Sequence, residues 1–159
     1  MIILQTAVGD IAIEDVFADI NGNTKTIKQV SKVTIQNSIV ANDPTRPSPD
    51  IVGTLISLGY NLFVDTSGAT FDLATHTQHG TDKTLSVNEL TTLFASPVEL
   101  RDNGGSTKTL ALAPDSPAID QIPLDACHVN GITIDQRGVK RPQGIGCDIG
   151  AYEHMAALT

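Results

Sequence analysis

The sequence predicts an all-β fold, and two observations indicate that its strands form successive stacked layers. Apolar residues alternate with polar ones in short segments such as Val33-x-Ile35, which places two apolar side chains on one face of a strand. Ile11, Val33 and Leu55 also lie 22 residues apart, a spacing typical of the coils of a β-solenoid. These patterns leave a β-sandwich open as the alternative.

The individual elements follow in chain order. The window Ile13–Ile20 has apolar residues at helical spacing and predicts one short helix. Later segments alternate as strands do, and residues suited to tight bends or to positive φ separate them. The alternating pairs are Ile11-x-Ile13, Val33-x-Ile35, Leu62-x-Val64, Phe71-x-Leu73 and Leu85-x-Val87, and the turns are Asn21-Gly22-Asn23, Asn42-Asp43-Pro44, Ser67-Gly68, His79-Gly80 and Asn103-Gly104-Gly105.

The composition fits one domain with a thin, layered core. The chain has 159 residues, of which 40% are hydrophobic and only 4% aromatic. Its formal net charge of −8 opposes binding to nucleic acid or to anionic membranes, because phosphate recognition needs clustered Lys and Arg. The charge is compatible with cation binding and with a secreted protein.

No apolar stretch approaches the ~20 residues of a membrane-spanning helix. The start, Met1-Ile2-Ile3-Leu4, has neither the basic region nor the cleavage site of a signal peptide. Either the protein stays where it is made or the reading frame begins inside a longer secreted gene. The rest of the sequence favours the second reading, an N-terminally truncated chain that is secreted or on the cell surface.

The two cysteines, Cys127 and Cys147, predict a disulfide. The segment between them has no second cysteine pair and one histidine, so a zinc finger is poorly supported. A disulfide that closes a loop of this size stabilises a fold by about 3 kcal/mol in the chain-entropy model. Two unpaired thiols are the alternative.

Three stretches resemble the C-terminal end of bacterial secreted right-handed parallel β-helix repeat proteins, the kind often followed by variable anchoring signals. The resemblance covers roughly Val33 to Glu153. It is carried by Asn37-Ser38-Ile39-Val40-Ala41-Asn42 with Ser57-Leu58-Gly59-Tyr60-Asn61-Leu62, by Asp102–Leu112 running into Ser116-Pro117-Ala118-Ile119-Asp120, and by Asp135–Pro142 with Cys147-Asp148-Ile149-Gly150-Ala151-Tyr152-Glu153.

The resemblance implies a short right-handed parallel β-helix with a loop-rich C-terminal closing segment. We expect a single domain: an unassigned N-terminal segment at 1–32, β-helix coils at 33–100, and the closing segment at 101–159. Such proteins are usually longer, so the N-terminal end would be an open sheet edge. We expect Ile13–Ile20 to cover this edge or the protein to form a homo-oligomer through it.

The closing segment is rich in acidic residues, which suggests a Ca²⁺ site because calcium prefers carboxylate and carbonyl oxygens on loops. The candidate ligands are Asp120, Asp135 and Asp148. The alternative, that each Asp caps a turn or accepts from nearby backbone amides, is favoured. The full acidic set is Asp115, Asp120, Asp125, Asp135, Asp148 and Glu153.

Three residues are candidates for a catalytic or ligand role. Asp135 and Arg137 suit a bidentate ion pair that would clamp a loop onto the last coil. His128 directly follows Cys127, so the predicted disulfide would hold its backbone, and a His beside a carboxylate can act as a general base. Solvated loop histidines and a structural clamp are the favoured alternatives.

Two function hypotheses follow. The first is an extracellular or surface module with a structural or interaction role, such as adhesion or binding of a glycan, a small molecule or a protein. The second is a Ca²⁺-assisted hydrolase or polysaccharide lyase that uses surface carboxylates and a loop His. The lack of a concentrated carboxylate–His motif favours the first. The chain also has no G-x-S-x-G motif and no phosphate-binding loop.

Overall fold

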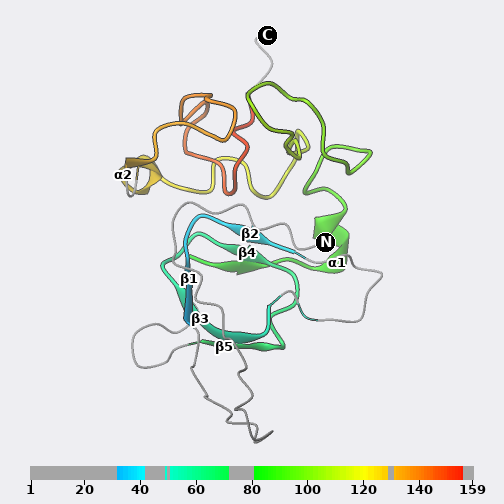
Figure 1. The fold of residues 1–159 in the computed structure, drawn as a ribbon, viewed down its shortest axis with the longest axis vertical. Helices are drawn as coiled ribbons and strands as arrows, with labels where there is room; N and C mark the ends of the chain where they lie inside the picture. The colour runs from blue at the N-terminus through cyan, green and yellow to red at the C-terminus, as the bar shows by residue number, and fades with distance from the viewer. Residues whose placement is uncertain (1–31, 42–48, 50, 72–80, 129–130, 156–159) are drawn as a thin grey trace, which may run out of the picture.

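A computed structural model describes residues 32–41, 49, 51–71, 81–128 and 131–155. Within them the regular elements are short strands and two single-turn helices, followed by a long region of turns and isolated bridges (Figure 1). The elements are β1 (Lys32–Ile35), β2 (Ile39–Val40), β3 (Gly53–Ser57), β4 (Leu62–Phe63), β5 (Ala69–Phe71), β6 (Lys83–Thr84), α1 (Val87–Leu90) and α2 (Leu124–Cys127).

The strands form two three-stranded parallel sheets, ordered β1-β3-β5 and β2-β4-β6. The chain therefore places one strand in each sheet before it moves to the next level. We call each such pair, β1 with β2, β3 with β4 and β5 with β6, a rung. The predicted 22-residue spacing is confirmed for one pair, since Val33 lies opposite Leu55 in the register of β1 and β3. The all-parallel pairing does not fit a β-sandwich, whose sheets are antiparallel.

Three polar residues, one in front of each strand of the sheet β2-β4-β6, form a ladder of hydrogen bonds, which we call the polar ladder. Ser38, Asn61 and Asp82 directly precede β2, β4 and β6. The buried Asn61 accepts from the backbone N–H of Ser38 at 3.0 Å, and its amide donates to Asp82 Oδ1 at 3.1 Å and to Ser57 Oγ at 2.9 Å. Side-chain bonds thus satisfy buried backbone groups at the bend and tie each rung to the next.

Strands β2 and β4 are buried on both faces, whereas β6 is exposed. Val40 and Phe63 pack against Ile35 and Leu55 of the other sheet, whereas their neighbours Ile39 and Leu62 belong to a separate core. Because side chains of adjacent strand residues point to opposite faces, one face looks toward the sheet β1-β3-β5 and the other outward. The outward face shares its core with Leu93 and with residues of the closing segment, which are Leu110, Leu112, Ala118, Ile122, Cys127, Cys147 and Ile149.

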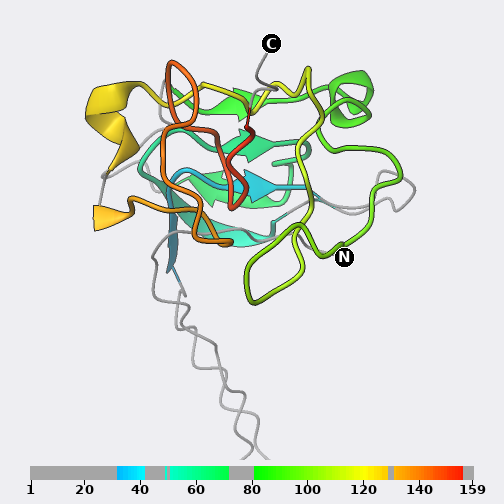
Figure 2. The same cartoon turned by 90° about the horizontal axis from the view of Figure 1, so that it is seen from above.

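The described residues therefore form three layers: the sheet β1-β3-β5, the sheet β2-β4-β6, and the closing segment across the latter (Figures 1 and 2). The same core includes Leu85, which immediately follows β6. Backbone contact supports the packing, since the N–H of Gly150 donates to the carbonyl of Asn37 at 3.0 Å.

One predicted strand is wrong. In the pair Leu85-x-Val87, Leu85 is buried, but Val87 is 59% exposed and begins α1. The reason is a capping box: Ser86 accepts from the N–H of Glu89, and the Glu89 carboxylate accepts from the N–H of Ser86. These bonds start a helical turn where the alternation alone suggested a strand.

The predicted turn at Gly104-Gly105 is present, with φ values of 94° and 84°. Asn37, between β1 and β2, has a φ of 50° that the sequence pattern did not predict. The residues 13–20 that were expected to cover the N-terminal edge lie outside the described residues. The predicted strand residues Ile11 and Leu73 and the predicted turns at Asn42 and His79 lie outside them as well.

Candidate functional site

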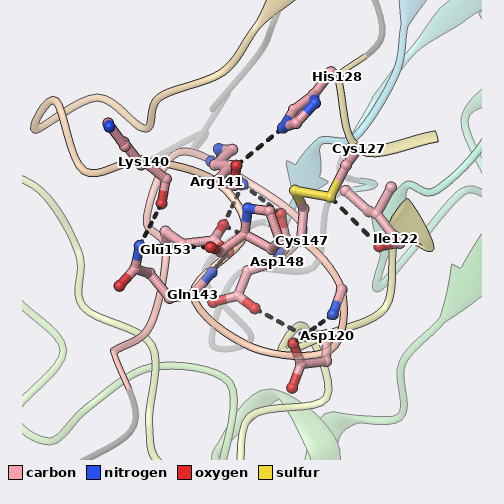
Figure 3. The surroundings of a disulfide bond; sticks show 12 residues. Asp120, Ile122, Cys127, His128, Lys140, Arg141, Gln143, Cys147, Asp148 and Glu153 are labelled. Carbon is pink, nitrogen blue, oxygen red and sulfur yellow. Dashed lines mark hydrogen bonds and ion pairs between the residues drawn. A yellow bond between two sulfur atoms is a disulfide. The ribbon is translucent and has the colours of Figure 1, made fainter. Parts of the chain in front are cut away.

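The predicted disulfide between Cys127 and Cys147 is confirmed (Figure 3). The two Cα atoms are 5.5 Å apart, and both residues are buried in the core beneath the closing segment. Ile122 pairs with Cys147 through two backbone hydrogen bonds of 3.0 and 2.8 Å. The disulfide thus joins the end of α2 to the segment that carries the last acidic residues.

Asp135 and Arg137 form the predicted ion pair, but both guanidinium nitrogens donate to one carboxylate oxygen, because backbone N–H groups occupy the other. Nε and one terminal nitrogen of Arg137 donate to Asp135 Oδ2 at 2.9 and 2.7 Å, and the two side chains are 3% and 0% exposed. Asp135 also accepts from the backbone N–H groups of Arg137, Val139 and Glu153. The Arg137 guanidinium lies 3.6 Å above the ring centre of Tyr152. The pair therefore connects the 135–139 turn to the end of the described chain.

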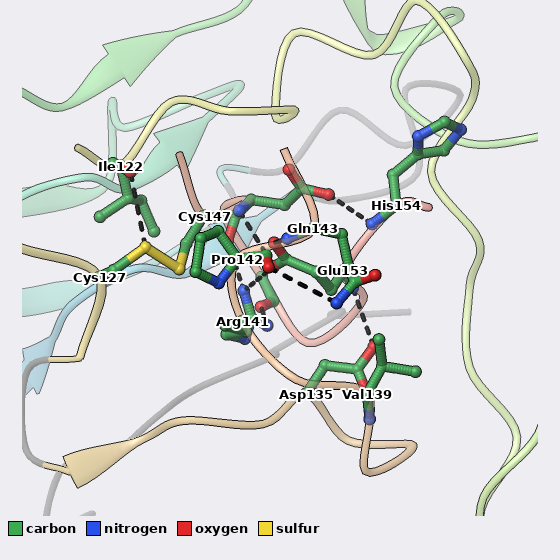
Figure 4. A network of polar contacts seen from close by, with 12 residues as sticks. Ile122, Cys127, Asp135, Val139, Arg141, Pro142, Gln143, Cys147, Glu153 and His154 are labelled. Carbon is green, nitrogen blue, oxygen red and sulfur yellow. Dashed lines mark hydrogen bonds and ion pairs between the residues drawn. A yellow bond between two sulfur atoms is a disulfide. The ribbon is translucent and has the colours of Figure 1, made fainter. Parts of the chain in front are cut away.

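A second buried pair lies beside the first (Figure 4). Arg141 donates to the Glu153 carboxylate at 2.8 Å, and the two side chains are 7% and 0% exposed. Arg141 also donates to the carbonyls of Asp148 and Gly150, at 2.7 and 2.5 Å. Glu153 accepts from the N–H of Gln143 as well. We call Asp135, Arg137, Arg141, Asp148 and Glu153 the clamp.

Asp148 links the clamp to Asp120. Its carboxylate accepts from the N–H of Asp120 at 2.8 Å and from the N–H of His154 at 2.5 Å. The Asp120 carboxylate in turn accepts from the N–H of Gly146 at 3.0 Å. Both carboxylates thus engage backbone amides in the described region, as the structural alternative predicts for turn-capping Asp residues.

The pKa values of the clamp carboxylates are shifted in different directions. Burial opposes ionisation of Asp135, but the hydrogen bonds from Glu153, Arg137 and Val139 outweigh it, so the pKa of Asp135 is lowered. Burial raises the pKa of Asp148. Burial, followed by the nearby charge of Asp148, raises the pKa of Glu153 to about 7.

His128 lies apart from the predicted partners. It is exposed at the end of α2, and its Nε2 donates to the carbonyl of Arg141 at 2.9 Å. Figure 3 shows this contact beside the disulfide. The catalytic set of His128, Asp135 and Arg137 thus contains one ion pair and a histidine that bonds a different residue.

The three expected calcium ligands do not bond to one common set of partners. Asp120 and Asp148 are neighbours through a backbone hydrogen bond, whereas Asp135 is paired with Arg137. In the described part of the chain, no group of three or more His, Cys, Asp or Glu side chains is arranged to hold a metal ion.

Arg141 and Glu153 are the polar residues whose roles the sequence did not reveal. Glu153 was one of six acidic residues in the closing segment, with nothing to single it out, and Arg141 was part of the matched stretch Asp135–Pro142. Their pairing joins positions 12 residues apart across a loop, and no periodicity encodes such a contact.

No family model, curated protein or solved structure matches the chain. Among the described residues, no helix is long and apolar enough to cross a membrane.

Proposed function

We propose that this chain is the C-terminal part of an extracellular or cell-surface right-handed parallel β-helix, with a structural and interaction role. The rungs would be coils of a solenoid, and the closing segment would stabilise them. The partner would be a glycan, a small molecule or another protein, bound on the surface of the stack. Self-association through the N-terminal edge is part of the same proposal.

The observation that supports the structural role is that the charged groups of the clamp are buried and hydrogen-bonded to one another or to the backbone. Asp135, Asp148 and Glu153 are 6%, 2% and 0% exposed. Their carboxylates accept hydrogen bonds from backbone amides or from arginines. A catalytic acid or base must reach a substrate proton directly or through one water. Buried carboxylates that already accept hydrogen bonds within the protein are suited to a structural role.

The solenoid is supported by the alternation of strands between two parallel sheets and by the 22-residue register between β1 and β3. Right-handedness rests on the resemblance and on the strong preference for right-handed crossovers between parallel strands. An experimental density map that traced a left-handed path from β1 through β2 to β3 would contradict this part of the proposal.

The disulfide supports the proposed extracellular or cell-surface location. Disulfides persist in oxidising environments and are rare where glutathione and thioredoxin keep thiols reduced. Protein purified from an oxidising compartment should show no free thiol before reduction. Free Cys127 and Cys147 in such protein would contradict secretion as a disulfide-bonded module.

A Ca²⁺-assisted hydrolase or lyase is the second candidate. The observation in its favour is the raised pKa of Glu153, because shifted acidities gather at active sites. Against it, the Glu153 side chain is 0% exposed and its partner Arg141 is 7% exposed. We rank it second for that reason.

One experiment separates the two candidates. The full chain is tested on a panel of ester and glycan substrates with and without EGTA, in parallel with a glycan-binding array. We expect no turnover in any condition. Turnover that EGTA and His128→Ala both abolish, but that the matched control His154→Ala preserves, would establish the enzymatic candidate instead.

A further inference from the structure

A small cavity lies where the closing segment meets the first rung, beside the disulfide. Its volume is about 30 Å³. It is lined by Asn37, Ile122, Cys127, Ile132, Arg141 and Gly150. One water molecule needs about 10–15 Å³ of such space, so the cavity is large enough for one or two.

Two buried polar atoms on the cavity lining have no hydrogen-bond partner among the described residues. They are Nε of Arg141 and Oδ1 of Asn37. The Arg141 side chain is only 7% exposed, and its other nitrogens donate to Asp148, Gly150 and Glu153. The Nε–H is therefore a buried, unpaired donor of a residue that lines the cavity.

An unpaired polar atom in the interior costs about 1–3 kcal/mol, and more when the group is charged. Native proteins offset this cost with ordered water that bonds two to four buried polar groups. A donor and an acceptor on residues that line the same cavity match water, which accepts from one group and donates to the other. An anion matches less well, because the Asn37 oxygen would repel it.

We propose that this cavity is a binding site for a structural water molecule that accepts from Arg141 Nε and donates to Asn37 Oδ1. The water would join the first rung to the clamp, next to the direct backbone bond from Gly150 to Asn37. It would also complete the hydrogen bonding of the buried Arg141. The proposal does not depend on the proposed function.

The test is a crystal structure of the full chain at a resolution that orders solvent, with NMR in solution as a second readout. We expect a density peak within hydrogen-bond distance of both atoms and a cross-relaxation peak between the Arg141 Nε proton and water. A cavity without density, or an Nε proton without contact to water, would overturn the proposal.

The variant Asn37→Asp distinguishes water from an anion. Asp tolerates the positive φ of 50° at this position, and its carboxylate still accepts from a water molecule. We expect the variant to retain the peak. Loss of the peak in the variant, or an anomalous signal in the cavity of wild-type crystals soaked in bromide, would assign the site to an anion and overturn the proposal. Asn88→Asp, at an exposed position on α1, is the matched control and should leave the cavity unchanged.

Discussion

The raised pKa of Glu153 predicts that stability falls as pH rises through the neutral range. The pKa is 4.5 in an ordinary environment and about 7 in the folded protein. The folded state therefore holds the proton more tightly than the unfolded chain does. Its stabilising contribution is complete below pH 4.5 and is lost as pH rises through 7.

The size of the effect follows from the shift. Each pKa unit corresponds to about 1.4 kcal/mol, so Glu153 alone lowers the free energy of unfolding by about 3 kcal/mol across this window. The raised pKa of Asp148 acts in the same direction. Asp135 acts oppositely: its lowered pKa gives stability that is present above its ordinary value of 3.8 and lost at lower pH, outside the window.

The assay is urea unfolding of the disulfide-bonded protein between pH 4.5 and 8, for wild type and Glu153→Gln. The substituted amide cannot ionise, so the slope of stability with pH should flatten by about 3 kcal/mol over the window. Its single oxygen cannot accept from Arg141 and Gln143 on opposite sides, which lowers stability by about 1–3 kcal/mol at every pH. Equal slopes for the two proteins would refute the reasoning. Glu99→Gln, at a side chain that is 57% exposed, should keep the wild-type slope.

Three further predictions concern the disulfide, the core between the two sheets and the polar ladder. Reduction of Cys127–Cys147 should lower the free energy of unfolding by about 3 kcal/mol, measured by urea unfolding with and without reductant. Phe63→Ala should cost about 3–5 kcal/mol in the same assay, because the side chain is fully buried between the sheets. Asn61→Ala should cost about 1–3 kcal/mol, because it leaves the buried N–H of Ser38 without its acceptor.

Each of these has a direct check. Thiol labelling of the unreduced protein, read by intact mass, would contradict the disulfide. Val52→Ala, at a residue that is 78% exposed, should change stability by no more than about 0.5 kcal/mol. A loss at Phe63→Ala as small as this control would place Phe63 outside the core. Asn88→Ala on the exposed face of α1 is the control for Asn61, and equal effects of the two would argue against the polar ladder.

The sequence predicted local features better than the path of the closing segment. The spacing of Val33 and Leu55 anticipated a parallel pair, because successive layers repeat the same inward position. The two cysteines anticipated the disulfide. Both predictions use information that is local or that repeats along the chain.

The lateral position of the closing segment was not anticipated. We expected it to close the last coil, whereas it covers one face of a sheet. A signal was present: Ile39-Val40 and Leu62-Phe63 are consecutive apolar pairs, which indicate strands buried on both faces. What the pairs do not reveal is which segment supplies the cover, because the partners lie tens of residues away in turns without periodicity.

The lateral cover changes how the stack should unfold. Repeats that touch only their neighbours can fray from an end one at a time. Here the closing segment shares one core with Ile39 in β2, Leu62 in β4 and Leu85, which directly follows β6. Neither β2 nor β4 can separate without losing part of this core, so we expect the closing segment, which lies along the stack, to make their unfolding cooperative.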